Sequence, residues 1–419
     1  MTRLVAAAAS LSVALVLAGC AEPRPLPTPT PTPTETVAQP TGDGVLRIGA
    51  LVPMSGDING ISPGMVAAVE LAVRDANVAG GALGANIEAF YRDAGTVDGD
   101  RLESGFAELV ERKIDVVIAP SSPVLLARLL PLAAEAGVAV VATAAPGPMV
   151  RLAEPAGVLL RTIPAVDREA VAIAQALVDG GADTIALVAG SDLHGRAVVD
   201  AVQEALSGTS TTISAVERAD SGTNIRRLSF SLASSEPDAV VIATTGLPTA
   251  QTAALVTALL DRGVRGEQLW LTAEGLGDYS SLLATGALEG ATGVRVGASV
   301  DEQFAARLRQ SDPLLRIDRF APETYDGVVL AVLATVIAGD DGGPSIARAF
   351  TESLRGDVVC RSVGECLDVL DNRHTIDYDG LSGPLGIDEA GDVVSGALSV
   401  FRYDDQNRPQ PTEAVSFGG

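Results

Sequence analysis

The sequence predicts an α/β protein built from two doubly wound lobes. Short β-branched runs such as 115–119 and 138–142 alternate with segments in which apolar residues recur at helical spacing, as in 124–136. Strands that alternate with helices in this way form parallel sheets. The alternation starts again after Pro164 and shows no short-period repeat, so we expect two lobes rather than a solenoid.

The first lobe is expected to begin at the strand 45–52. Its other predicted elements follow in chain order: helix 64–77, strand 86–91, helix 101–112, strand 115–119, helix 124–136 and strand 138–142. Ligands bind such sheets at the carboxyl ends of the strands, because free backbone N–H groups and helix N-termini point there. The loops 120–123 and 143–148 leave this edge, so we expect them to line a binding site.

The second lobe repeats the pattern. Its predicted elements are helix 166–179, strand 184–189, helix 195–206, strand 212–216, helix 225–232, strand 239–243, helix 249–260 and strand 268–272. A further helix, 322–338, is apolar on most of its faces. We expect this helix to be buried and to pack back on the first lobe.

The first residues predict an export signal. The apolar run 4–17 is too short to span a bilayer and is typical of a signal peptide. The sequence Leu17-Ala18-Gly19-Cys20 resembles the bacterial lipobox, which implies removal of residues 1–19 and lipid on the Cys20 sulfur. An anchor of more than one acyl chain holds a protein stably on the outer face of the cytoplasmic membrane. The alternative is an ordinary signal peptide with an incidental cysteine.

Residues 20–44 predict a tether. Proline occupies every second position from 25 to 33, which forbids helix and favours extended polyproline of about 3.1 Å per residue. Such a segment can hold a folded body away from a membrane. The alternative is a tail without a spacing role.

Charge and cysteine content limit the partners. The net charge of −24 argues against nucleic acid as a partner, because its recognition needs clustered Lys and Arg.

Cys360 and Cys366 remain once Cys20 is assigned to lipid, and an even number of cysteines in an exported chain predicts a disulfide. Free thiols or a metal site are the alternatives, but His374 stands alone without a second ligand pair, so we expect no metal and no cofactor.

Four short motifs carry a resemblance to a known family. They are Pro53-Met54-Ser55-Gly56, Asp75-Ala76-Asn77 with Gly80-Gly81, Ala273-Glu274-Gly275, and Gly380 to Leu385 with Asp388 to Asp392. In this order they resemble the type I periplasmic binding proteins of the branched-chain amino-acid, amide and urea transport group. The resemblance covers nearly all of 45–405.

The resemblance implies two lobes joined by three crossings that form a hinge, near Ile163, Ala298 and Leu398. The implied domains are a first lobe of 45–162 plus 299–397 and a second lobe of 163–298 plus 398–419. The lobes would open and close on a small solute.

The resemblance also implies ligand residues. Glu274 matches the acidic residue that receives a ligand ammonium, through charge-assisted hydrogen bonds, with a capping or surface role as the alternative. Ala144 would offer a backbone group. The family's two hydroxyl positions for the α-carboxylate fall on Pro123 and Pro146, so Ser121 or Ser122 would substitute, helped by the helix N-terminus behind them.

Other positions complete the expected site. His194 lies where the family often has a cleft tyrosine, and a solvated loop histidine is its alternative. Gly246 takes the other aromatic position. Ile61 and Phe320 are expected apolar linings, and Phe320 could equally belong to the core. For Ser121 and Ser122 the alternative is a plain helix cap.

We therefore expect a monomeric extracytoplasmic lipoprotein that captures a small polar solute, an amino acid or a related amine or amide, for an ABC permease. The alternatives are a lipid-anchored ligand-sensing receptor, a cleft that binds nothing small, and, least favoured, a hydrolase. No HExxH helix or Walker loop is present. With only His194 and His374, a nucleophile and base pair has little to draw on, so we expect no enzyme.

Overall fold

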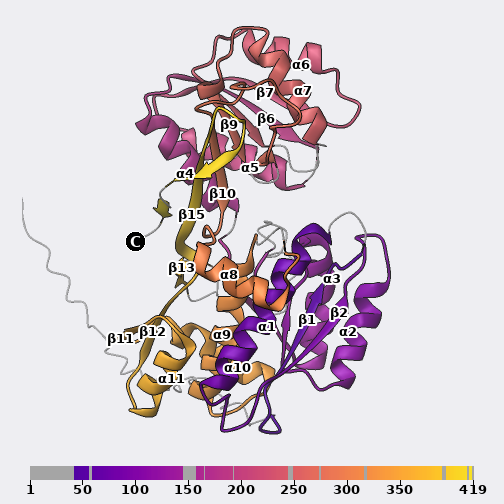
Figure 1. The fold of residues 1–419 in the computed structure, drawn as a ribbon, viewed down its shortest axis with the longest axis vertical. Coiled ribbons are helices and arrows are strands. Elements are labelled where there is room, and N and C mark those ends of the chain that lie inside the picture. Colours follow the sequence, from indigo (N-terminus) through magenta and orange to yellow (C-terminus); the bar gives the residue numbers. More distant parts are fainter. Residues whose placement is uncertain are drawn as a thin grey trace, which may run out of the picture. The chain divides into compact units, whose positions relative to one another are not determined.

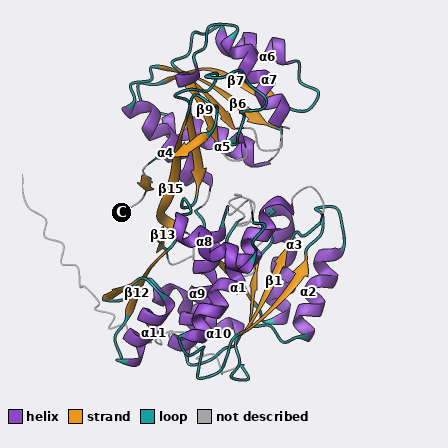
Figure 2. Ribbon diagram, viewed as in Figure 1, coloured by secondary structure: helices purple, strands orange, loops and turns teal. Residues whose placement is uncertain are grey.

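Two separate sheets, one parallel throughout and one mixed, organise the computed structural model of the chain (Figure 1). The structure describes residues 42–55, 59–144, 157–164, 166–191, 193–243, 249–272, 275–315, 319–388, 393–412 and 415–417. The predicted signal peptide, Cys20 and most of the predicted tether lie outside these residues. Helices cover both faces of each sheet (Figure 2).

The first sheet has the strand order β2-β1-β3-β4-β5, and all its neighbours are parallel. Its strands are β1 (Arg47–Val52), β2 (Glu88–Asp93), β3 (Val116–Ile118), β4 (Ala139–Ala142) and β5 (Leu159–Arg161). Every residue of β3 and β4 is buried, because apolar side chains on both faces meet a helix layer. The predicted strands of this lobe are confirmed, and β5 is an additional strand that was not predicted.

Two helix layers enclose the first sheet. The helices α1 (Ser62–Val78) and α9 (Ala321–Ala338) pack on one face, and α2 (Arg101–Glu111) and α3 (Pro123–Ala136) pack on the other. By length and composition α9 could cross a membrane, but 83% of it is buried inside the protein. The expectation of a buried helix packed on the first lobe is confirmed, and α9 is a core helix.

The second sheet follows the order β14-β15-β10-β9-β8-β6-β7, with β16 and β17 also paired to β15. Its strands are β6 (Thr184–Gly190), β7 (Thr212–Ala219), β8 (Ala239–Ala243), β9 (Leu269–Thr272), β10 (Thr292–Val296), β14 (Gly386–Ile387), β15 (Val393–Tyr403), β16 (Pro409–Pro411) and β17 (Val415–Phe417). Its helices are α4 (Val166–Asp179), α5 (Leu193–Leu206), α6 (Ile225–Ala233) and α7 (Thr249–Leu260). All eight elements predicted for this lobe are confirmed.

The remaining elements belong to the last third of the chain or to short turns. They are α8 (Glu302–Ser311), α10 (Gly343–Ala349), α11 (Val363–Asp371), β11 (Val358–Cys360), β12 (Ile376–Gly380), β13 (Gly383–Pro384) and the 3₁₀ turns η1 (Asn59–Ile61), η3 (Gly266–Gln268) and η5 (Phe350–Ser353). The strands β12 and β13 form an antiparallel hairpin within the Gly380 motif. The strand β15 begins before Leu398 and continues through it, and the predicted lobe boundaries stay a prediction.

Candidate functional site

The carboxyl ends of the strands bring several predicted site residues to one edge of the first sheet. Ile61 lies in η1 after β1, Ser121 and Ser122 follow β3, and Ala144 follows β4. The three strands are consecutive in the sheet. Loops that are far apart in the sequence therefore share one edge, as expected for ligand binding in this fold class.

Ser122 is the N-cap of α3. Its hydroxyl accepts the N–H of Leu125 at 3.5 Å, a long hydrogen bond, and its carbonyl accepts the N–H of Leu126 at 2.9 Å. Pro123 occupies the first position of the helix, where its missing N–H costs nothing. The hydroxyl thus has a capping role, and the neighbouring Ser121 is half-buried. The N-terminus of α3 favours an anion at this edge.

The segment after β4 packs against the start of α9. The Thr143 and Thr324 hydroxyl groups are 2.9 Å apart in a buried hydrogen bond. Ala144 as a whole is 3% exposed, so it offers a partner little accessible surface in this arrangement. Pro146 lies in 145–156, outside the described residues.

Asp93 organises two loops of this edge. At the end of β2, Oδ1 accepts the N–H groups of Met54 and Gly95, each at 2.8 Å, and Oδ2 accepts from the Ser55 hydroxyl and Arg101 Nη1, each at 2.6 Å. Burial alone raises the pKa of Asp93, but these hydrogen bonds outweigh it and lower the pKa to about 2. The carboxylate therefore stays ionised and holds the loop after β1. No sequence motif points to Asp93.

Phe320 belongs to the core of the first lobe. Its side chain is 5% exposed and packs in the cluster that contains Ala321 and Tyr325. It precedes α9 with a left-handed φ of 63°. The Arg319 guanidinium carbon lies 4.5 Å from the centre of its ring. Of the two roles that the sequence allows, the structure places Phe320 in the core.

The second-lobe candidates fall mostly outside the described residues. Gly246 lies in 244–248 and Glu274 lies in 273–274, both outside them, and nothing is described of the His194 side chain, although its backbone opens α5. The strands that precede these positions are β6, β8 and β9, which are neighbours in the order β9-β8-β6. The carboxyl ends of these parallel strands lie at the same edge of the second sheet. These three contacts stay predictions.

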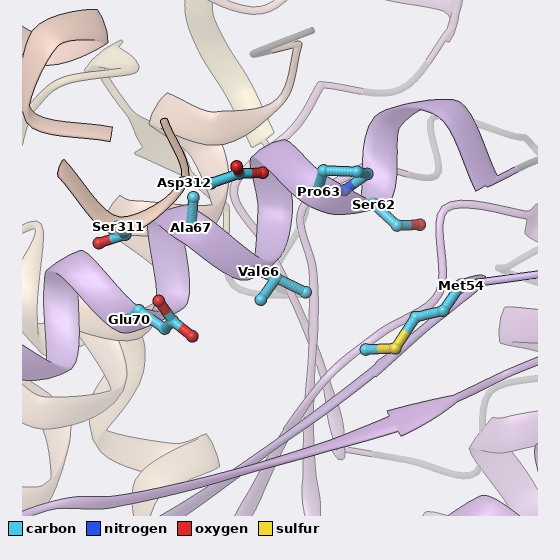
Figure 3. A pocket seen from close by; sticks show the side chains of 8 residues that line it. All are labelled: Met54, Ser62, Pro63, Val66, Ala67, Glu70, Ser311 and Asp312. Carbon is cyan, nitrogen blue, oxygen red and sulfur yellow. The ribbon is translucent and has the colours of Figure 1, made fainter. Parts of the chain in front are cut away.

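A cavity of about 320 Å³ lies beside the β1 loop in the first lobe (Figure 3). Its lining comes from the loop after β1, the first turns of α1 and the end of α8: Met54, Ser62, Pro63, Val66, Ala67, Glu70, Ser311 and Asp312. The Ser62 hydroxyl donates to the Pro53 carbonyl, which fixes the start of α1 against that loop. None of the predicted ligand residues that the structure describes lines this cavity.

A second cavity, of about 570 Å³, lies on the second sheet between α4 and the strands β10 and β15. Asp238, which precedes β8, and Glu267, which precedes β9, line it. These positions mark the amino ends of the strands, so this cavity is separate from the predicted edge. Within the described part of the chain, no group of three or more His, Cys, Asp or Glu could hold a metal ion.

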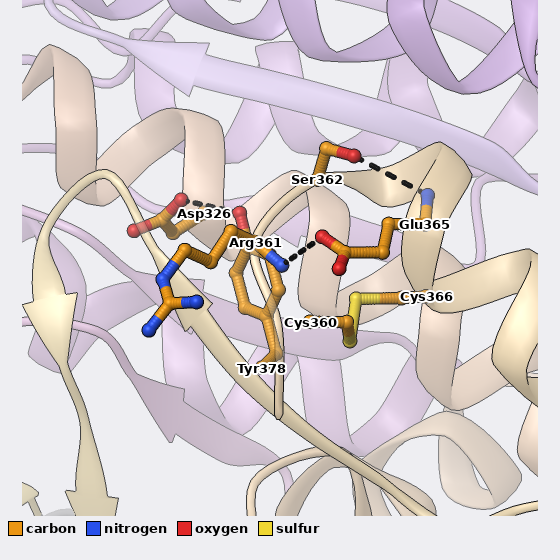
Figure 4. The surroundings of a disulfide bond; sticks show 7 residues. All are labelled: Asp326, Cys360, Arg361, Ser362, Glu365, Cys366 and Tyr378. Atoms are coloured by element: carbon orange, nitrogen blue, oxygen red, sulfur yellow. Dashed lines mark hydrogen bonds between the residues drawn. A yellow bond between two sulfur atoms is a disulfide. The ribbon is translucent and has the colours of Figure 1, made fainter. Parts of the chain in front are cut away.

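The predicted disulfide joins Cys360 and Cys366, whose Cα atoms are 5.3 Å apart (Figure 4). Ser362 caps α11 by accepting the N–H of Glu365 at 3.2 Å, and Glu365 Oε2 accepts the N–H of Arg361 at 2.8 Å. Both sulfur-bearing residues are fully buried in the core of the first lobe. The pair is structural and lies away from the strand edge described above.

Comparison with solved structures supports the same fold. The branched-chain amino acid transporter substrate binding protein LivJ from Streptococcus pneumoniae, in complex with isoleucine, is 15% identical with a TM-score of 0.68, over 90% of this chain and 100% of that one. The leucine binding protein LivK from Thermotoga maritima is 15% identical with a TM-score of 0.66, over 88% and 98%. A solute binding protein of an ABC transporter from Rhodopseudomonas palustris BisB5, in complex with 3,4-dihydroxybenzoic acid, is 16% identical with a TM-score of 0.66, over 90% and 99%.

No curated protein matches the sequence. A family model described as periplasmic binding protein matches residues 45–408, most of the chain. The expectation of a non-enzymatic protein agrees with this family, whose members bind solutes. The two-lobed α/β fold with parallel sheets is that of the type I members. The chain belongs to the periplasmic binding protein family.

Proposed function

We propose that the chain is an exported lipoprotein that captures a small amino acid or related amine between its two lobes and presents it to an ABC permease. The observation that carries the proposal is the shared edge of the first sheet, where the loops after β1, β3 and β4 meet. The solute would touch both lobes only when they close, so its differential affinity sets the population of the closed form.

The chemistry of the edge supports a solute with a carboxylate. The N-terminus of α3 carries Ser121 and Ser122 and no acidic side chain in its first turn. Such a helix end favours an anion. Three similar structures are an isoleucine complex, a 3,4-dihydroxybenzoic acid complex and a leucine binding protein. On the second lobe, Glu274 would receive the ammonium group, which favours an amino acid over an aromatic acid.

A thermal-shift screen tests the proposal. The purified full chain is screened against amino acids, amides, urea, polyamines and aromatic acids. We expect stabilisation by an amine-bearing carboxylic acid, and we expect Glu274→Ala to abolish it. Asp278→Ala is the matched control, because Asp278 is an exposed carboxylate four residues away that pairs with Arg408 at 3.4 Å. An equal response in Glu274→Ala and native protein removes Glu274 from the site, and stabilisation by aromatic acids alone overturns the solute class.

The anchor is tested separately. We propose that residues 1–19 are cleaved and that Cys20 carries the lipid, with 20–44 as a tether. In a bacterial host, the native chain should fractionate with membranes and incorporate labelled palmitate. Cys20→Ser should do neither, while its folded body remains intact. Membrane association that survives this substitution contradicts the lipoprotein assignment.

A further inference from the structure

One buried residue contacts two of the three predicted crossings between the lobes, one through its side chain and the other through its backbone. Glu323 lies in the first turn of α9 and is 1% exposed. Its Oε1 accepts the N–H of Ala298, at the second crossing, at 2.7 Å. Its backbone carbonyl accepts the hydroxyl of Thr162, at the first crossing, at 2.8 Å. Glu323 thus connects both crossings, by hydrogen bonds, to the N-terminal end of α9.

The third crossing is hydrogen-bonded to the second crossing through Gly297 and Ser299, the two neighbours of Ala298. The Ser399 hydroxyl donates to the Gly297 carbonyl at 2.7 Å and accepts from the Ser299 hydroxyl at 2.9 Å. Gly297 has φ of +99°, and a Cβ atom there would lie 2.3 Å from Glu323 Oε1. Glycine is therefore required for the close approach of the carboxyl group to the second crossing.

The Glu323 carboxyl group is held by few partners for a buried acid. Its Oε2 is buried, and among the described residues no hydrogen-bond partner reaches it. Burial raises the pKa of Glu323 to about 7, and Asp326 acts in the same direction. The Ala298 N–H and the Arg295 charge act against this shift.

Two more cations lie nearby in the sequence. Arg161, beside the first crossing, and Arg319, before α9, each take part in an interaction. Arg295 also lies 5.1 Å from the centre of the Phe401 ring. The charged groups that act on the Glu323 carboxyl group include Arg295 from β10 and Asp326 from α9.

We propose that Glu323 is a positioning residue of the hinge, whose carboxyl group holds the second crossing against the first lobe and makes the arrangement of the crossings depend on pH. The inference rests on the proposed function, in which the lobes move about these crossings. A neutral carboxyl group can stay buried with one hydrogen bond, whereas a buried carboxylate with one bare oxygen is costly. Ionisation therefore favours arrangements in which Glu323 reaches water.

The direction of the pH effect follows from the raised pKa. The described arrangement is fully favoured below the ordinary pKa of 4.5 and loses that advantage as pH rises to about 7. Glu323→Gln keeps an oxygen for the Ala298 N–H but cannot ionise. We expect this variant to stay in the described arrangement at all pH values.

The test measures the distance between the lobes without any solute. Spin labels are placed at Val78→Cys in the first lobe and Phe230→Cys in the second, 85% and 61% exposed, in the full chain with Cys20→Ser. We expect the distance distribution to change between pH 5 and pH 8, and Glu323→Gln to remove the change. A pH-independent distribution in the parent, or an equal change in Glu323→Gln, overturns the proposal.

Two further variants sharpen the result. Asp115→Asn is the matched control, because Asp115 also has a pKa raised by burial to about 7 but accepts the N–H of Arg47, at the start of β1. We expect it to keep the parent's pH response. If Glu323→Gln does not fold, Arg295→Met is used instead; it should move the midpoint to higher pH, and an unchanged midpoint overturns the proposal. Because no solute is present, a failed solute screen leaves this outcome unaffected.

Discussion

The Ser55 hydroxyl donates a 2.6 Å hydrogen bond to the Asp93 carboxylate, and this contact joins the loop after β1 to the end of β2. The same carboxylate also accepts the Met54 N–H. The loop carries the Pro53 motif of the family resemblance. Its conformation is thus set by a residue on a neighbouring strand, 38 residues away in the sequence.

Asp93→Asn should destabilise the protein at neutral pH. The depressed pKa of about 2, against an ordinary 3.8, corresponds to about 2 kcal/mol of stability that is present above pH 3.8 and lost as pH falls through 2. Urea unfolding at pH 7 and pH 3 measures the free energy of unfolding of both proteins. The difference should shrink at the lower pH. Asp98→Asn is the control, because Asp98 is an exposed acid in the loop after β2. If the difference in unfolding free energy between Asp93→Asn and the native chain does not depend on pH, the stabilising role of the Asp93 carboxylate is contradicted.

Strand ends were predictable because β-branched runs stop at proline, glycine or serine. The predicted bounds of 239–243 and 249–260 match β8 and α7 at both ends. The same signal placed Ser122 and Ala144 at the carboxyl ends of neighbouring strands. This signal depends only on neighbouring residues in the sequence. The parallel sheet is then predicted from the alternation of strands and helices.

Other features depend on contacts between distant residues. Glu323 occurs in an apolar helical sequence, and its role comes from an N–H group 25 residues away. The role of Asp93 likewise comes from a contact with a residue distant in the sequence, Ser55. α8 has few apolar residues, so its pattern is weak, and β15 contains Ser395 and Gly396, which interrupt a strand pattern. Sequence patterns report burial and local geometry, so they do not reveal such partners.

Reduction of the disulfide should lower stability without loss of binding. Cys360 and Cys366 close a loop of sequence separation six, worth about 2 kcal/mol on the chain-entropy model. Denaturant unfolding with and without reductant measures the change. The double variant Cys360→Ser with Cys366→Ser should not respond to reductant and should still bind solute. An equal response of this variant and the native chain would assign the effect to another group.

Asp326→Ala should be among the more destabilising substitutions in α9. The Asp326 carboxylate is fully buried and accepts from the Tyr378 hydroxyl at 2.7 Å, the Leu381 N–H at 3.1 Å and both the N–H and hydroxyl of Ser382. Its loss leaves these donors without an acceptor, at a cost of at least about 3 kcal/mol. Chemical unfolding measures the loss, with the exposed Asp368→Ala as control. A loss below that of ordinary surface variants would contradict the role of Asp326.

Asp115→Asn should stabilise the protein above neutral pH. Burial raises the pKa of Asp115 to about 7, although the Arg47 N–H opposes the shift, and the nearby Asp341 adds to it. A carboxyl group with a raised pKa contributes stability that is full below pH 3.8 and is lost as pH rises through 7. Asn keeps an acceptor for Arg47 and carries no charge. Allowing for partial exposure, we expect a gain of about 1 kcal/mol at pH 8 and none at pH 4. Thermal unfolding at the two pH values measures it, and a variant no more stable than the native chain at pH 8 would show that the Asp115 charge is not costly where it lies.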